Sequence, residues 1–464
     1  MGERGKEDMG HRAKKYALLL IVCLALAGCG TWRSRDSAAQ EPDLRSLGGD
    51  TETVSVGEPA PSTIRELGSA SDQGLGLASD LASDQGPGLA SDQASDQGPG
   101  PASDLASDQG PDLASDQGPG LASDLASDQE PGSAPDQEPP DTGYEFTICF
   151  AGDINLDENW DTTLFMDQQP DGIYGCISPE LVETMREADI MCLNNEFTYS
   201  TGGAPLPGKA YTFRADPKRV EVLEQLGVDA VTLANNHVYD YGAEALLDTF
   251  AVLEEAEVPY FGAGRTLEEA MEPLYLEVEG KTIALVAASR AEKYKMTPQA
   301  TDTEPGILRC YDTELFLQAI REGSENADFC IAFVHWGTEY SFDLEQVQLD
   351  TGREYLDAGA DAVIGAHSHC LQGMEYYDGK PIVYSLGNYW FNSKTLDTML
   401  LQLHFSGDDN GGQLEVQVVP AVQAGCRTTY AAQPEERRRI YDFLESISVN
   451  VEISDEGFVT EKSQ

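Results

Sequence analysis

From Tyr144 onward, short apolar runs alternate with stretches in which apolar residues recur every three or four positions. The runs have the length of buried strands, and the stretches between them have the period of amphipathic helices. Strands are predicted over 145–151, 189–193, 229–233, 281–288, 329–334, 362–364, 381–385, 398–405 and 414–419. Helices are predicted over 217–226, 243–255, 314–321, 344–357 and 435–444. This alternation predicts an α/β fold with parallel βαβ units first and an antiparallel portion later.

Five of the predicted strands end in short polar clusters. The clusters are Gly152-Asp153, Asn194-Asn195-Glu196, Asn235-Asn236-His237, His335-Trp336-Gly337 and Gly365-Ala366-His367-Ser368-His369. Sites in open α/β sheets gather beyond the carboxyl ends of the strands. We therefore expect these clusters to converge in space, although more than 200 residues separate the first from the last.

The histidines concentrate in the same clusters. The chain has six, and His11 lies near the N-terminus, so five remain in the rest of the chain. Four of these follow strands, and only His404 lies within a strand pattern, which predicts a structural role for it. Three imidazoles, two carboxylates and a carboxamide form a mixed nitrogen and oxygen set that suits Mn, Fe or Zn. The set predicts two divalent ions that share one carboxylate.

The clusters, in this order and spacing, resemble the CapA/PgsA family of poly-γ-glutamate capsule proteins, within the calcineurin-like metallophosphoesterase superfamily. The resemblance runs from about residue 145 to 392 and rests on six motifs: Gly152–Asn155, Asn194–Glu196, Ala234–Gly242, Val334–Tyr340, Gly365–Gln372 and Tyr384–Phe391. It implies a four-layer α/β/β/α sandwich of metallophosphoesterase type.

The resemblance also implies a role for each matching residue. The implied metal ligands are Asp153, Glu196, Asn236, His335, His367 and His369, with Glu196 bridging two ions. His237 takes the position of the acid that protonates a leaving group, and Asp240 would orient it. Substrate or supporting contacts are implied for Asn155, Glu339, Gln372 and Asn388. The superfamily usually has histidine where this chain has Asn155, and aspartate where it has Glu196.

The N-terminal 143 residues have a different character. Residues 1–28 combine a basic start with the apolar run 16–27, which is too short for a membrane span and fits a signal peptide. The sequence Leu26-Ala27-Gly28-Cys29 resembles a bacterial lipobox, which implies lipidation of Cys29 and a protein anchored outside the cytoplasm. Residues 29–143 contain ten Ala-Ser-Asp repeats and predict a disordered acidic tether. The folded domain is predicted over 144–464.

Charge and cysteine content limit the function classes further. The net charge of −52 excludes a general nucleic-acid binder, and residues 144–464 contribute −36 of it from 56 acidic and 20 basic side chains. Seven cysteines lie in that segment, several in strand patterns, which predicts a domain not built around disulfides.

Three functions remain open at this point. The first is a lipid-anchored protein of poly-γ-glutamate synthesis, export or anchoring, with a metal-dependent hydrolase-type site and membrane synthase subunits as partners. The second is a metal-dependent phosphoesterase acting on another cell-surface substrate. The third is a non-catalytic scaffold of a membrane synthase complex.

Overall fold

A computed structural model describes residues 143–292, 295–408 and 411–462. The predicted signal peptide, Cys29 and all but the last residue of the predicted tether lie outside these residues.

The larger of two main sheets is mixed. Its order is β19 (Val451–Ile453), β20 (Phe458–Glu461), β17 (Gly411–Ala424), β16 (Leu396–Asp408), β1 (Tyr144–Ile154), β2 (Ile190–Asn195), β5 (Ala230–Thr232) and β6 (Tyr260–Phe261). In addition, β15 (Asn388–Trp390) pairs with β1, and β18 (Arg427–Tyr430) pairs with β17. Strands β1, β2, β5 and β6 are parallel, whereas β16 and β17 form a long antiparallel hairpin.

The second main sheet is parallel at its centre and antiparallel at both edges. Its order is β13 (Leu371–Tyr377), β14 (Lys380–Leu386), β12 (Ala362–Ala366), β11 (Phe329–His335), β9 (Lys281–Ser289) and β8 (Leu274–Val278). Two short pairs complete the described strands: β3 (Thr198–Tyr199) with β4 (Arg214–Ala215), and β7 (Ala263–Gly264) with β10 (Gly306–Ile307).

The described helices are short. They are α2 (Asp161–Met166), α3 (Pro179–Glu187), α4 (Glu221–Leu226), α5 (Gly242–Glu255), α6 (Leu267–Met271), α7 (Glu314–Asn326), α8 (Gln346–Asp357) and α9 (Pro434–Ser446), with 3₁₀ segments η1 (Gly172–Gly175) and η2 (Pro217–Val220). Within the described ranges, none is both long enough and apolar enough to cross a bilayer.

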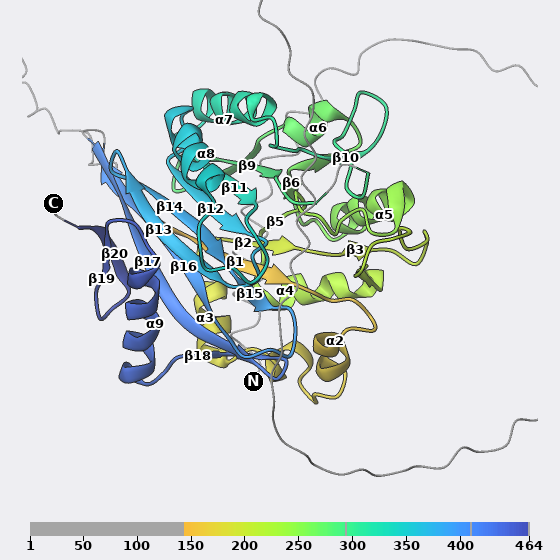
Figure 1. Cartoon of the computed structure of the whole chain (residues 1–464), viewed down its shortest axis with the longest axis horizontal. Helices are drawn as coiled ribbons and strands as arrows, with labels where there is room; N and C mark the ends of the chain where they lie inside the picture. Colours follow the sequence, from red (N-terminus) through yellow and green to blue (C-terminus); the bar gives the residue numbers. More distant parts are fainter. Residues whose placement is uncertain (1–142, 293–294, 409–410, 463–464) are drawn as a thin grey trace, which may run out of the picture. The chain divides into compact units, whose positions relative to one another are not determined.

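Alternating side chains on β1 explain how the layers form. Phe146, Ile148 and Phe150 join the core between the two sheets, where Phe150 lies 6.4 Å from Phe333 of β11 between ring centroids. Cys149 and Ala151 point to the opposite face, which α3, α4 and α5 cover. A third core lies between the second sheet and helices α7 and α8. The described residues therefore stack as helices, sheet, sheet and helices (Figure 1).

The mixed α/β class predicted from the sequence is confirmed, and each predicted strand and helix is present with its ends moved by a few residues. Helix α3 and strand β13, among others, were not predicted. Asp157, in the loop after β1, is buried, and its carboxylate accepts hydrogen bonds from the backbone N–H groups of Asn159 and Arg214 at 2.9 and 2.7 Å.

Candidate metal centre

The strand-end clusters converge between the two sheets. Asp153 is the second-to-last residue of strand β1, and Glu196 directly follows β2 in the same sheet. His335 ends β11 and His367 directly follows β12 in the facing sheet. All six side chains predicted to bind metal are buried, none more than 7 % exposed: Asp153, Glu196, Asn236, His335, His367 and His369. The structure thus gathers residues that the sequence separates by more than 200 positions.

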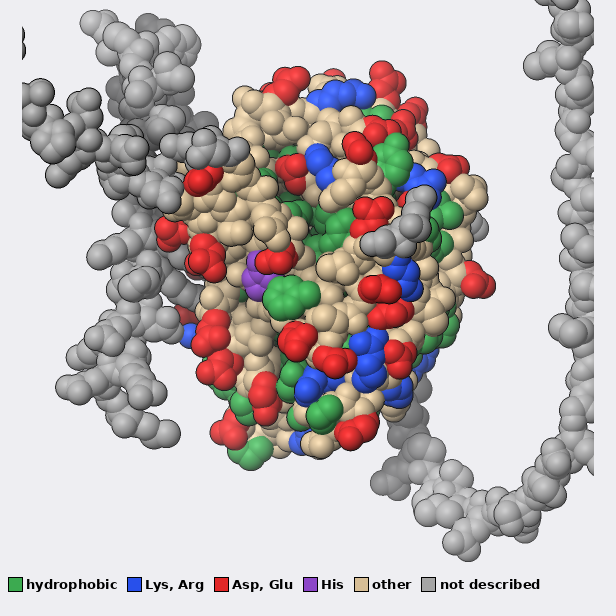
Figure 2. Space-filling view, turned by 90° about the vertical axis from the view of Figure 1, so that its left-hand side faces the viewer, with side chains coloured by type: hydrophobic (Ala, Val, Ile, Leu, Met, Phe, Trp, Pro, Cys, Tyr) green, Lys and Arg blue, Asp and Glu red, His purple; other side chains and the backbone are tan. Residues whose placement is uncertain are grey.

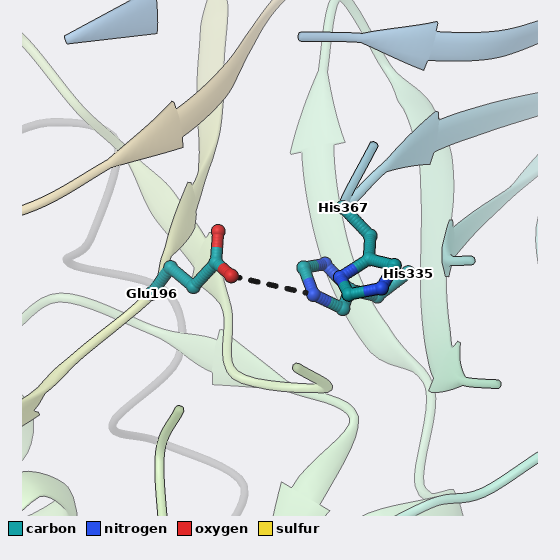
Figure 3. Close-up of side chains that lie close together, drawn as sticks. All are labelled: Glu196, His335 and His367. Atoms are coloured by element: carbon teal, nitrogen blue, oxygen red, sulfur yellow. Dashed lines mark ion pairs between the residues drawn. The ribbon is translucent and has the colours of Figure 1, made fainter. Parts of the chain in front are cut away.

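Two groups of these side chains have the spacing of metal ligands. Glu196, His335 and His367 form one group, in which the rings of both histidines lie beside the carboxylate (Figure 3). Asp153, Glu196 and His369 form the other. Within each group, one donor atom from each residue lies within 4.8 Å of the others. Glu196 is the member that both groups share, as a bridging carboxylate would be.

The surroundings of Glu196 fit a bound cation. Its Oε1 atom is buried and accepts no hydrogen bond from the described residues. The Nε2 atoms of His335, His237 and His369 lie 3.5, 3.9 and 4.0 Å from it. Ligand atoms about 2.1 Å from a shared ion are separated by about 3–4 Å from one another. The imidazole nitrogens around Glu196 Oε1 therefore have the spacing of ligands around an ion and lie too far away for direct hydrogen bonds to that atom.

Burial also prepares the imidazoles to act as ligands. Desolvation lowers the pKa of both His335 and His367 well below the usual histidine value, and the neighbouring histidines lower it further. Both rings are therefore neutral at pH 7, which is the form that binds metals. His335 Nε2 also lies 2.7 Å from Asn236 Oδ1, so the carboxamide is placed to join the first group. The Nδ1 atom of His367 is buried and has no hydrogen-bond partner in the described part of the chain.

The pKa of Glu196 is shifted in the opposite direction. Burial raises it well above the usual glutamate value, and the nearby charge of Asp153 raises it further. Without a cation, this carboxylate is therefore strongly driven to hold a proton. A divalent ion bound beside it would offset both effects by stabilising the charged carboxylate.

Asn194 organises the carboxylates, and the sequence analysis assigned it no role. Its Nδ2 group donates to Asp153 Oδ1 at 2.7 Å and to Glu196 Oε2 at 3.3 Å. Its Oδ1 accepts from the side chain of Asn235 at 2.9 Å. Asn194 is part of the strand-end cluster Asn194-Asn195-Glu196, but the sequence does not show which of these side chains points toward the carboxylates.

His237 lies at the edge of the ligand groups, beside Asp240. Its Nδ1 is 2.7 Å from Asp240 Oδ2, so the Nε2 atom faces Glu196. Desolvation lowers the pKa of His237, the Lys209 charge acts in the same direction, and Asp240 opposes both. This pair has the arrangement predicted for an oriented acid–base histidine.

Lys209 extends this arrangement and was missed by the sequence analysis. Its ammonium group lies 2.6 Å from Asp240 Oδ1 and 2.8 Å from Glu292 Oε2, and it donates to the backbone oxygen of Asn236. The lysine side chain is only 5 % exposed. The one clue in the sequence was an isolated basic residue within a glycine- and proline-containing loop after Ser200.

The four residues predicted to contact substrate or support the site lie in different places. The Oδ1 atom of Asn388 lies 2.8 Å from His369 Nδ1, within hydrogen-bond distance. Asn155 accepts from the Asp157 backbone N–H at 2.7 Å, and its Nδ2 has no partner among the described residues. Glu339 is exposed, and its charge contributes to the raised pKa of Glu196. Gln372 is one layer further out, bonded to Gln348 and to the backbone oxygen of Ser341.

The backbone at the histidine motif is unusual. His367 has φ = 94° and His369 has φ = 55°, both in the left-handed region that non-glycine residues rarely adopt. Such conformations persist when the surrounding structure holds them, and they cluster at functional sites. Two glycines allow the close approach of chains here: a Cβ on Gly152 would lie 1.9 Å from the backbone oxygen of Gly387, and one on Gly365 would lie 1.9 Å from that of Tyr384.

The remaining histidine and the tryptophans lie outside the ligand groups. His404 is in β16, where its ring nitrogens lie 2.9 Å from Thr147 Oγ1 and 3.0 Å from Gln417 Oε1. Trp336 and Trp390 are fully buried, and each indole N–H donates to a backbone oxygen. The hydrogen bonds of these three side chains go to groups of the fold and not to the predicted metal ligands.

Comparison with known proteins gives one family match. The model described as "Bacterial capsule synthesis protein PGA_cap" matches residues 147–393, which include every predicted ligand. The chain is 33 % identical over 207 residues to the PGA biosynthesis protein CapA of Bacillus subtilis, covering 44 % of this chain and 54 % of that one. It is 33 % identical over 213 residues to the capsule biosynthesis protein CapA of Bacillus anthracis, covering 44 % and 50 %. The chain thus spans about half the length of these relatives.

Among solved structures, the NAD nucleotidase of Haemophilus influenzae aligns with a TM-score of 0.36 and 11 % identity, over 66 % of this chain and 64 % of that one.

Proposed function

Because the chain belongs to the bacterial capsule synthesis protein family PGA_cap, we propose that it takes part in the synthesis, export or anchoring of poly-γ-glutamate. The family match and the two Bacillus relatives, which are named for capsule or PGA biosynthesis, support this proposal. We further propose that its centre is a metal-dependent hydrolase-type site, in a fold of metallophosphoesterase type.

One observation carries the metal-dependent part of the proposal. The buried Glu196 Oε1 accepts no hydrogen bond among the described residues and is surrounded by imidazole nitrogens at 3.5–4.0 Å. We assign Asn236, His335 and His367 to one divalent ion, Asp153 and His369 to a second, and Glu196 to both. Bound there, divalent Mn, Fe or Zn would supply the polarisation of an acyl or phosphoryl oxygen and a lowered pKa for a bound water.

The protein's own groups supply positioning and a proton. Asp240 holds the Nδ1 side of His237, so its Nε2 faces the shared carboxylate. Asp240 also stabilises the protonated ring, and in that form His237 can give its Nε2 proton to a leaving group at the edge of the site. Asn194 holds Asp153 and Glu196 in place through its carboxamide, so the carboxylates are oriented before any ligand binds.

The location of the protein is a separate part of the proposal. The predicted lipidation of Cys29 would attach the chain to the outer face of the cell membrane, and the acidic segment 29–143 would let the domain stand away from it. There it would meet the growing polymer and the membrane subunits of the synthase.

A specific observation also favours a second function. A mixed set of imidazole, carboxylate and carboxamide ligands around a shared carboxylate, with a carboxylate-oriented histidine beside it, serves phosphoester hydrolysis equally well. The second candidate is therefore a phosphoesterase that acts on another cell-surface substrate.

The decisive experiment combines metal analysis with genetics. We expect the purified protein to contain divalent metal, and the Asp153→Ala and His367→Ala variants to lose it together with complementation of a capsule-deficient deletion strain. His404→Ala is the matched control, because it removes a histidine outside the site. Unchanged metal content in the site variants would contradict the assignment of ligands.

The same variants separate the alternatives. Turnover of phosphodiesters by the purified protein, with a normal capsule in the deletion strain, would favour the phosphoesterase. A capsule that requires the protein but tolerates both His237→Ala and loss of metal would favour a scaffold of the synthase complex.

A further inference from the structure

The loop that follows β15 is rigidly built beside the metal centre. Gln423 is fully buried, and its Oε1 atom accepts hydrogen bonds from the backbone N–H groups of Phe391 and Asn392 at 2.8 and 3.3 Å. Its Nε2 group donates to Asn392 Oδ1 at 2.9 Å and to the Lys394 backbone oxygen at 3.3 Å. One buried side chain thus fixes the whole turn from Phe391 to Lys394.

Tyr340 reaches the same place from the loop after β11. Its backbone has φ = 58°, a left-handed conformation that is unfavourable for a bulky side chain, and its N–H donates to the Ser368 oxygen at 2.6 Å. Its hydroxyl accepts from Asn392 Nδ2 at 3.3 Å. The ring lies 5.7 Å from the His369 ring, between centroids, and the residue is 39 % exposed. The strained backbone therefore places an accessible ring next to a predicted metal ligand.

Lys394 places a positive charge on this ring. Its ammonium nitrogen lies 3.4 Å from the centroid of the Tyr340 ring, in a cation–π contact. The side chain is exposed, and across residues 143–292, 295–408 and 411–462 it forms no ion pair with a carboxylate. The charge is thus positioned by the ring and not neutralised by a described partner.

This charge lies in strongly negative surroundings. Residues 144–464 carry a net charge of −36, and Asp and Glu side chains are spread over the face seen in Figure 2. The site itself contains the buried carboxylates Asp153, Glu196 and Asp240, and Glu339 lies next to Tyr340 in the chain. An anionic ligand would be repelled at long range, so a fixed cation such as Lys394 would add to the attraction of the metal ions proposed for the site.

We propose that Tyr340, Asn392 and Lys394 form a subsite that binds a carboxylate of the substrate beside His369. The inference rests on the proposed function and adds to it a determinant of specificity: the site selects a polyamide whose units carry free carboxylates over an uncharged one. Lys394 makes the ionic contact, and the Tyr340 ring and the Asn392 carboxamide hold it in position.

The test measures binding of a fluorescently labelled poly-γ-glutamate oligomer to the purified, metal-loaded full chain. Lys394→Met keeps the aliphatic stem and removes the charge, and we expect it to raise Kd by about 5-fold, the upper end for loss of an exposed ion pair. Lys394→Arg keeps the charge and should stay within about twofold of the parent. Lys218→Met is the matched control, because it removes the charge of another exposed lysine and should leave Kd unchanged.

Two further measurements separate this subsite from the proposed function. Metal content must be unchanged in Lys394→Met, and an uncharged polyglutamine-type oligomer should bind parent and variant equally. If the parent binds poly-γ-glutamate and Lys394→Met binds it as tightly, the subsite is refuted and the proposed function stands. If the metal-loaded parent does not bind the oligomer, the subsite is refuted, and complementation of the deletion strain decides the proposed function separately.

Discussion

Lys209 provides the sharpest test of how the site is held together. Its ammonium group lies 2.6 Å from Asp240 Oδ1 and 2.8 Å from Glu292 Oε2. The Asp240 carboxylate is fully buried, and its Oδ1 atom accepts no directional hydrogen bond from the described residues. The lysine is therefore the direct electrostatic compensation for that oxygen, and Lys209→Met would leave a buried charge uncompensated.

The cost of this substitution can be bounded. At an effective dielectric constant of about 20, the direct attraction across 2.6 Å is about 6 kcal/mol, before the cost of desolvating the lysine is subtracted. Removing one partner of a buried ion pair costs about 3–5 kcal/mol. Asp240 keeps the Phe213 N–H at 2.7 Å and the His237 ring, and Glu292 is 23 % exposed, so both carboxylates retain some stabilisation. We expect a loss near the lower end, about 3 kcal/mol.

The assay is urea unfolding of the purified protein, followed by tryptophan fluorescence. A loss of about 3 kcal/mol should lower the midpoint by roughly 1 M for an m-value of about 3 kcal/mol/M. The double variant Lys209→Met/Asp240→Asn removes the charges of both partners and should recover most of the stability. Lys218→Met, which removes an exposed lysine, should change it by less than about 0.5 kcal/mol. A loss below about 1 kcal/mol for Lys209→Met, or no recovery in the double variant, would refute the reasoning.

Three other measurements follow from the structure. Because burial and Asp153 raise the pKa of Glu196 in the folded protein, this residue should make the metal-free protein lose stability as pH rises above 4.5, where the unfolded chain releases this proton first. The lowered pKa values of His335, His367 and His237 act in the opposite direction up to pH 6.5, so the contribution of Glu196 is measured as the difference in the pH slope of the melting temperature between the parent and Glu196→Gln, and this difference should shrink when metal is added. Gly152→Ala should prevent folding or cost more than about 3 kcal/mol, because its Cβ would lie 1.9 Å from the Gly387 oxygen, whereas Gly411→Ala has open space and should fold normally by circular dichroism. The seven described cysteines are all free and buried, so they should resist a thiol reagent in the native protein and react after denaturation; rapid labelling of the native protein would contradict their burial.

The sequence predicts the ligand positions well because one rule governs them. Apolar strand patterns end at Asp153, Glu196 and His335, and the carboxyl ends of neighbouring strands meet at one edge. The same rule cannot show that two separate sheets face each other and supply ligands from both sides. That arrangement depends on packing between distant residues such as Phe150 and Phe333.

The supporting residues could not be predicted for a different reason. Lys209 and Glu292 lie in irregular loops, where no period indicates which side chain points inward. Gln372 was predicted to contact or support the site, and the structure shows that its carboxamide is already bonded to Gln348 and to the Ser341 backbone. Such hydrogen bonds depend on side-chain direction, which the residue type alone does not determine.

The left-handed backbone at His367 and His369 lowers the stability of the fold at positions where the proposed metal site needs histidine. At φ = 94° and 55°, the local conformation favours glycine, while ion binding requires imidazole. A His367→Gly chain would be relieved of about 1 kcal/mol of backbone strain in its metal-free state and would lose a ligand at the same time. The metal-free protein is therefore less stable than the same fold with glycine at these positions, and metal binding would stabilise the folded state and offset the backbone strain.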